Sequence, residues 1–186
     1  MLKIISKTDN SQAAFGQGQT SGYENDSSLN YGHITTGTLM SKGQFFGYND
    51  TTHEVKVFYI EKWWGNCAEQ INGLVAIGGK IFAKMTPPYN LEGEDYEKIV
   101  GVAENSVYYH GYQKGTKSGR LGRIAETLGG SSNGWTGDYF WIKRGNMIAI
   151  LGGNCNLGSY CGSDCIALST KASEKSIQTG ASLHLE

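Results

Sequence analysis

Short apolar runs separated by polar segments divide the chain into a few elements. EVKVFYI (54–60) is rich in β-branched and aromatic side chains, which predicts a strand. LVAIGGKIFAKMT (74–86) places Gly78 and Gly79 between two apolar runs, which predicts a hairpin with its turn at the glycines. MIAILGG (147–153) is continuously apolar before its glycines and predicts a buried strand.

One segment has the spacing of a helix. In WWGNCAEQINGL (63–74), Asn66 suits an N-cap, and the residues after it include good helix formers. Ala68, Ile71 and Leu74 would then share one face. We therefore expect a short amphipathic helix that directly follows the first strand.

The rest of the chain predicts strands joined by long loops. SVYYHGYQ (106–113) and ASLHL (181–185) have the composition of strands. Residues 87–105 and 114–138 show no period, and unstructured segments of that length in a compact domain are usually functional or packed by their own side chains. The pattern as a whole predicts an α+β domain with few helices, antiparallel strands and much ordered loop.

Composition places these elements in one domain. The chain has 186 residues, enough for a core of its own, and its 27 glycines against 2 prolines indicate many tight turns. We expect residues 1–31 to form a polar arm or linker and residues 32–184 to form the domain, and we interpret residues 185–186 as a cloning scar.

Charge and hydropathy argue against some partners. The net charge is −1 and no basic block occurs, so nucleic acid is not expected as a partner. No apolar run approaches the length of a membrane span, and the first residues lack the long apolar region and cleavage site of a signal peptide. Membrane insertion is therefore not expected.

Three of the four cysteines lie in one glycine-rich stretch, GGNCNLGSYCGSDC (152–165). Cys155, Cys161 and Cys165 lack the close pairing that structural zinc sites use, and Cys67 is distant in sequence. The stretch also departs from both phosphate-binding glycine motifs. The leading interpretation is that the cysteines are small buried side chains or accessible side chains without a special role, while a disulfide between two of the four stays open.

No other cluster carries a catalytic or metal signature. The histidines are His33, His53, His110 and His184, and none has a local motif, although a Cys–His pair formed by the fold stays open. EGEDYE (92–97) lacks the alternation of an EF-hand and is interpreted as a solvated loop. We therefore expect no catalytic residue, no metal site and no cofactor.

Several motifs in order resemble a known family. The residues concerned are 37–75 with V-K-V-F and W-W-G-N, GGSSNGWTGDYFW (129–141), GGNCNLGSYCG (152–162) and ASEKSIQTGASL (172–183). These are similar to C-type-lectin-fold proteins related to the formylglycine-generating enzyme, which include the major-tropism-determinant-like variable proteins of diversity-generating retroelements in phages. The resemblance covers roughly residues 37–183.

The resemblance implies a C-type lectin fold and a C-terminal surface, about residues 150–183, that recognises a target. Framework positions would be the glycines and small residues Gly152, Gly153, Gly158, Gly162, Ala172, Ser173, Gly180 and Ala181. The ligand-binding side chains would be Asn154, Asn156, Ser159, Tyr160, Ser163, Asp164, Lys171, Glu174, Lys175 and Gln178. Asn, Ser, Tyr and Asp are products of adenine-directed mutation of an Asn codon, whereas Lys, Glu and Gln need another parent codon.

The function implied is a non-enzymatic receptor-binding protein on a virion or cell surface. Its partner would be a protein or a surface glycan of a host cell, and it would act as a monomer or a trimer. An oxidase of the formylglycine-generating type, using two cysteines, and a structural virion decoration protein are the alternatives. The E-P-N and Q-P-D tripeptides of calcium-dependent lectins do not occur, so calcium-dependent sugar binding is not implied.

Overall fold

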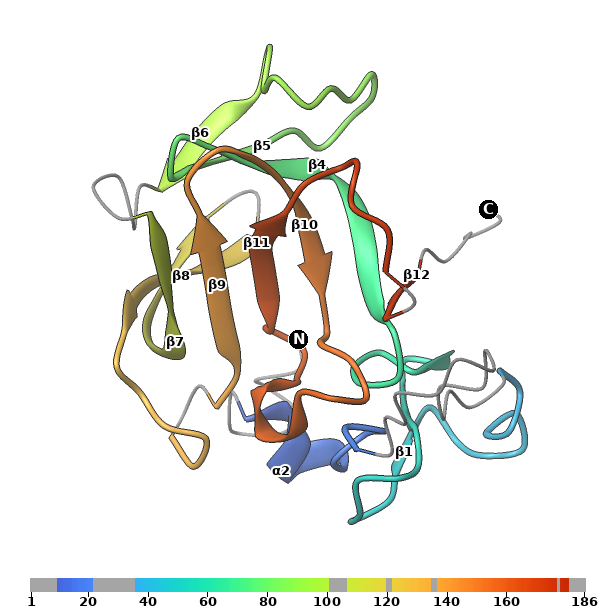
Figure 1. Cartoon of the computed structure of the whole chain (residues 1–186). Coiled ribbons are helices and arrows are strands. Elements are labelled where there is room, and N and C mark those ends of the chain that lie inside the picture. The colour runs from blue at the N-terminus through green and yellow to red at the C-terminus, as the bar shows by residue number, and fades with distance from the viewer. Residues whose placement is uncertain are drawn as a thin grey trace.

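A computed structural model of the chain describes residues 10–21, 36–100, 107–119, 122–134, 137–176 and 178–180. Of these residues, 43% lie in strands and 6% in helices. Figure 1 shows a large curled sheet, shaped like half a barrel, above a smaller group of elements that includes α2 and β1. The predicted α+β class with a C-type lectin fold is therefore wrong: this is a β-rich fold.

The large sheet is nine-stranded, in the order β6-β5-β4-β10-β11-β9-β7-β8, with β12 added beside β4. Its strands are β4 (Ala68–Ile77), β5 (Lys80–Ala83), β6 (Glu97–Val100), β7 (Tyr108–Gly119), β8 (Gly122–Leu128), β9 (Tyr139–Lys143), β10 (Asn146–Leu151), β11 (Ile166–Thr170) and β12 (Thr179–Gly180). Most neighbours are antiparallel, but β11 runs parallel to β9, and β12 runs parallel to β4. The sheet is therefore mixed.

The curl of the sheet encloses the main core. Phe140 and Ile142 of β9 and Leu168 of β11 are fully buried on its inner face. Ile81 of β5 and Ile124 of β8, from opposite parts of the strand order, join the same cluster. Strands near both ends of the sheet thus share one core, and no layer of helices from the described residues covers it.

A second, smaller core lies below the sheet. It is formed by the three-stranded sheet β1 (Phe45–Gly47), β2 (Val55–Val57) and β3 (Ile60–Glu61), together with helix α2 (Ser11–Phe15). Trp64 and Cys161 are fully buried in this cluster with the two valines of β2. Phe15 packs against it, with its ring stacked 5.5 Å from that of Phe45. Part of the predicted polar arm is therefore folded against the domain.

The helix predicted over 63–74 is wrong, because residues 68–77 form strand β4. β4 is hydrogen-bonded on both sides, to β5 and β10, so its backbone groups are satisfied by tertiary pairing. At Gly73 the chain adopts a φ of 82° and passes close to the Lys84 carbonyl, an approach that a side chain would block. A short apolar run fits either period, and non-local pairing decides here.

Other predicted elements are confirmed or extended. The hairpin with its turn at Gly78 and Gly79 joins β4 to β5, and the strand predicted over 147–153 is β10. The strand predicted over 54–60 is interrupted and becomes β2 and β3. The strand predicted over 106–113 continues to residue 119 and pairs with β8. The predicted loop over 114–138 is thus largely a hairpin.

Some predictions fall outside the described residues. These are the strand over 181–185, the histidines at 33 and 184, the framework residue Ala181 and the terminal dipeptide 185–186. Within the described part of the chain, the structure contains no helix with the length and apolar character needed to cross a bilayer.

Candidate binding surface

An aromatic surface covers the outer face of β7 and β9. We call it the aromatic platform, and it consists of Tyr108, His110, Tyr112, Tyr139, Trp141 and Tyr160. Side chains alternate between the faces of a strand, so the residues next to the buried Phe140 and Ile142 point outward. The antiparallel register places Tyr112 opposite Tyr139 and His110 opposite Trp141. The sheet itself therefore assembles the platform.

The rings of the platform contact one another. Tyr139 lies at the centre, 4.4 Å from Trp141 and 4.3 Å from Tyr160 between ring centroids. Tyr160 belongs to the 3₁₀ turn η1 (Gly158–Tyr160), which brings the glycine-rich stretch against the sheet. Tyr108 and Tyr160 are 47% and 38% exposed, which are high fractions for large aromatic side chains. A partner could therefore reach a continuous aromatic surface.

Hydrogen bonds hold this surface in place. The Tyr139 hydroxyl lies 2.8 Å from His110 Nδ1, and the Tyr112 hydroxyl lies 2.8 Å from Ser159 Oγ. Burial raises the pKa of the Tyr139 phenol, and the neighbouring Tyr160, Tyr108 and Tyr112 add to the shift. The phenol is thus a neutral hydrogen-bonding group at physiological pH, and the platform is preorganised.

A groove of about 250 Å³ adjoins the platform at Trp141. Trp141, Ala167 and Ile150, from three neighbouring strands, contribute apolar groups. The glycine-rich stretch and the segment before β12 contribute polar residues. The predicted binding residues that line the groove are Asn154, Glu174, Lys175 and Gln178. Two segments predicted to form one surface therefore meet there.

Other predicted residues lie beside the groove or away from it. Ser159 and Tyr160 lie on the turn at the platform, and both are exposed. Asn156 and Lys171 are also exposed but do not line the groove. These side chains are accessible, and the first pair belongs with the aromatic platform.

Ser163 and Asp164 are tied into the fold. The Ser163 amide donates to Ser11 Oγ of helix α2 at 2.9 Å. The Asp164 carboxylate forms an ion pair with Arg123 of β8, and its amide donates to the buried Asp138 carboxylate at 2.6 Å. The side chain of Asp164 therefore joins the turn to the sheet, a role that the sequence did not suggest.

The glycines and cysteines of the stretch support this turn. A Cβ at Gly162 would collide with the Asp138 carboxylate, so this position requires glycine. Cys155, Cys161 and Cys165 are buried, which confirms their interpretation as small buried side chains. Burial raises the pKa of the Cys161 and Cys165 thiols well above the usual value. Both thiols are therefore protonated at neutral pH, whereas the thiolate is the nucleophilic form.

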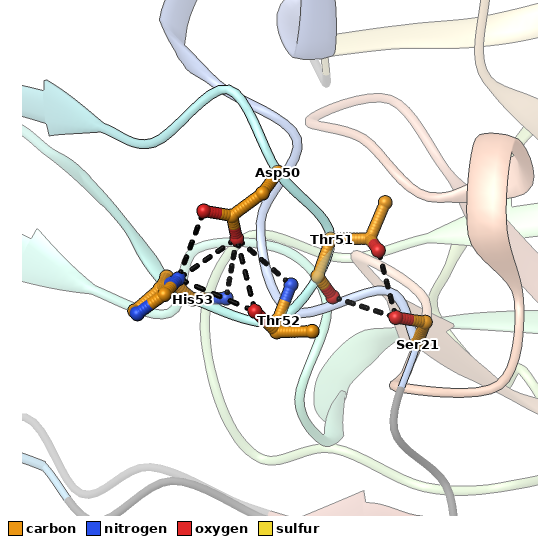
Figure 2. A network of polar contacts seen from close by, with 5 residues as sticks. All are labelled: Ser21, Asp50, Thr51, Thr52 and His53. Atoms are coloured by element: carbon orange, nitrogen blue, oxygen red, sulfur yellow. Dashed lines mark hydrogen bonds and ion pairs between the residues drawn. The ribbon is translucent and has the colours of Figure 1, made fainter.

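A polar network between β1 and β2 is the other notable cluster of side chains (Figure 2). Asp50 accepts hydrogen bonds from the amides of Thr52 and His53 at 3.0 and 3.2 Å and contacts His53 Nδ1 at 2.8 Å. The hydrogen bond from His53 and then that from the Thr52 amide lower the pKa of Asp50. The Ser21 hydroxyl contacts Thr51 Oγ1 at 2.7 Å rather than the imidazole. These contacts close an exposed turn.

Most residues of the platform were not predicted from the sequence to be binding residues. Only Tyr160 was among the predicted residues, although YYHGY and YFWIK carry aromatic side chains at alternate positions. That alternation is the available signal, because in a strand it places them on one face.

Comparisons with protein-family models, with curated proteins and with solved structures find no match for this chain.

Proposed function

We propose that the protein is a non-catalytic binding domain that recognises a target molecule on a host cell through the aromatic platform and the adjoining groove. The observation that carries this proposal is the exposed, interconnected aromatic surface beside Asn154, Glu174, Lys175 and Gln178. Rigid aromatic side chains give large contact areas at low entropic cost and dominate the binding energy of many interfaces.

The scaffold suits such a role. The platform lies on paired strands whose inner residues fill the main core, and the groove walls are loops attached to that sheet. Side chains on the outer face can therefore change without disturbing the core. Burial favours the protonated thiol of Cys161 and Cys165 at neutral pH, which argues against these two residues as the reactive pair of the alternative, a cysteine-dependent oxidase.

A cell-binding assay tests the proposal. The fluorescently labelled chain is incubated with a panel of cultured bacterial strains, and binding to intact cells is measured. We expect at least one strain to bind, and the double variant Tyr108→Ala, Tyr160→Ala to weaken that binding by about tenfold, because two exposed anchors are lost. Tyr89→Ala is the matched control, since Tyr89 is similarly exposed, at 40%, outside the platform. Equal binding by all three proteins would contradict the proposal.

A role as a variable protein of a diversity-generating retroelement is a further part of the proposal. Asn154, Ser159 and Tyr160 lie at the groove and platform and are of types that adenine-directed mutation of an Asn codon produces. A virion or cell-surface location goes with this role. The test is genomic: a near-copy of the region coding for residues 150–183 should differ at adenines and lie beside a reverse transcriptase gene. A locus without either would remove this part while leaving the binding surface intact.

A further inference from the structure

The groove next to Trp141 combines an apolar aromatic wall with polar side chains whose formal charges cancel. We infer that it binds a neutral pyranose ring of a glycan, with the indole of Trp141 against the apolar face of the sugar. This inference rests on the proposed binding function and names the class of ligand. A pyranose has C–H groups gathered on one face and a rim of hydroxyls, so it needs an apolar surface and hydrogen-bonding groups side by side.

Two amide side chains are placed to bind sugar hydroxyls. Asn154 Oδ1 accepts a hydrogen bond from the Asn156 amide at 3.0 Å, which fixes the carboxamide and directs its Nδ2 toward Gln178. The contact between Asn154 Nδ2 and Gln178 Oε1 is 3.4 Å, which is long for a hydrogen bond. A ligand hydroxyl could replace this contact, since each amide offers both a donor and an acceptor and a hydroxyl matches both.

The charges of the groove favour a neutral ligand. Glu174 and Lys175 are adjacent in the lining and opposite in sign, so their formal charges cancel. The remaining polar residues of the lining, such as Ser176 and Thr179, are uncharged. An acidic ligand would face the Glu174 carboxylate, and Lys175 is the one cation among the described lining residues that would offset it.

The dimensions favour one ring in the groove and further rings on the platform. A volume of about 250 Å³ is below the range of 300 to 1,000 Å³ typical of sites for drug-sized ligands, so the groove suits a single ring. The ring centroids of Tyr160 and Trp141 are 6.0 Å apart, and the Tyr139 ring contacts both. A glycan chain leaving the groove would therefore cross further aromatic surface, and longer oligosaccharides should bind more tightly.

An NMR titration tests the inference. The ¹⁵N-labelled full chain is titrated with neutral tetrasaccharides of glucose, galactose, mannose and N-acetylglucosamine, and with the acidic tetrasaccharide of galacturonic acid. We expect at least one neutral probe to shift the indole signal of Trp141 and the side-chain amide signals of Asn154 and Gln178. The matching monosaccharide should bind more weakly, and added sodium chloride should change the affinity little, because a neutral ligand is not screened.

Variants separate stacking from charge. Trp141→Ala should weaken binding of the neutral tetrasaccharide by about tenfold or more. Trp141→Phe should keep most of the affinity, which guards against a folding defect in the alanine variant. Lys175→Gln should change the affinity by less than about twofold, since a neutral sugar gains little from the ammonium.

Binding of the acidic probe alone, or binding that weakens steeply with salt and depends on Lys175, would overturn the inference in favour of an anionic ligand. Absence of binding by every saccharide would overturn it as well. If the cell-binding assay still showed loss of binding for the Tyr108→Ala, Tyr160→Ala variant, the proposed function would stand with a protein as the target. If no saccharide bound and the Tyr108→Ala, Tyr160→Ala variant bound cells as well as the unchanged chain, the proposed function would be wrong too.

Discussion

At the scale of single residues, neighbours in sequence have different tasks. Asp164 is an acidic residue and Tyr160 an aromatic residue of the glycine-rich stretch, and the family resemblance implies a binding role for both. In the structure Tyr160 is exposed on the platform, whereas Asp164 pairs with Arg123 of β8. The sequence could not separate them, because the partner of Asp164 lies about forty residues earlier in the chain and meets it only through the sheet.

This difference leads to a stability prediction. Asp164→Ala should lower the free energy of unfolding by about 1 to 2 kcal/mol, because it leaves the mostly buried Arg123 guanidinium without this carboxylate. Tyr160→Ala should cost less than about 1 kcal/mol, since its ring is partly in solvent. Urea unfolding of each variant checks this, with the exposed Glu174→Ala as the acidic control. Equal losses for Asp164→Ala and Glu174→Ala would contradict a structural role for Asp164.

At the scale of elements, local patterns predicted strands better than they predicted a helix. The hairpin at Gly78 and Gly79 was predictable because its turn residues and apolar runs are contiguous. The helix over 63–74 was not formed, because β4 lies between two strands that supply its hydrogen bonds. The aromatic alternation of β7 and β9 was visible in the sequence, but their pairing joins residues about thirty positions apart.

Helix α2 offers a prediction at this scale. A five-residue helix is not stable alone, so α2 depends on packing. Phe15→Ala should lower the free energy of unfolding by about 2 to 3 kcal/mol, because it removes the contacts with Phe45 and Trp64. Hydrogen exchange at the amides of Ala14 and Gly16, which bond within the helix, should accelerate.

The exposed Ala14→Ser is the control for this experiment and should cost less than about 0.5 kcal/mol. An unchanged unfolding free energy in Phe15→Ala would mean that the segment over 10–21 is an independent arm, as the sequence suggested, and that its packing contributes nothing to the domain.

At the scale of the whole molecule, the glycine-rich stretch connects the two cores. The Gly152 carbonyl accepts a hydrogen bond from the Gly65 amide near the small sheet, and the Gly152 amide donates to the Cys165 carbonyl just before β11 of the large sheet. Cys161 lies in the second core. The sequence did not predict this arrangement. The order of strands in the large sheet is set by non-local pairing, such as the parallel contact of β9 with β11, which no local pattern encodes.

Because the buried thiols lie at this junction, the stability of the whole domain should depend on their protonation. Burial raises the pKa of Cys161 and Cys165 in the folded state above the usual 9.0. Their stabilising effect is complete below the pKa of the unfolded thiol and is lost as the pH rises above it, because the unfolded chain then releases protons that the folded chain retains. Between the pKa of the unfolded thiol and that of the folded thiol, each such thiol lowers the free energy of unfolding by about 1.4 kcal/mol per pH unit.

Urea unfolding under reducing conditions at pH 7 and at about pH 10 should therefore show a lower unfolding free energy at the higher pH. The raised pKa of Tyr139 acts in the same direction, whereas burial lowers the pKa of Lys62, whose contribution has the opposite sign. Cys165→Ala separates these sources: it should be less stable at pH 7 but lose less stability on going to pH 10. An unchanged pH dependence in that variant would contradict the assignment of the alkaline instability to Cys165.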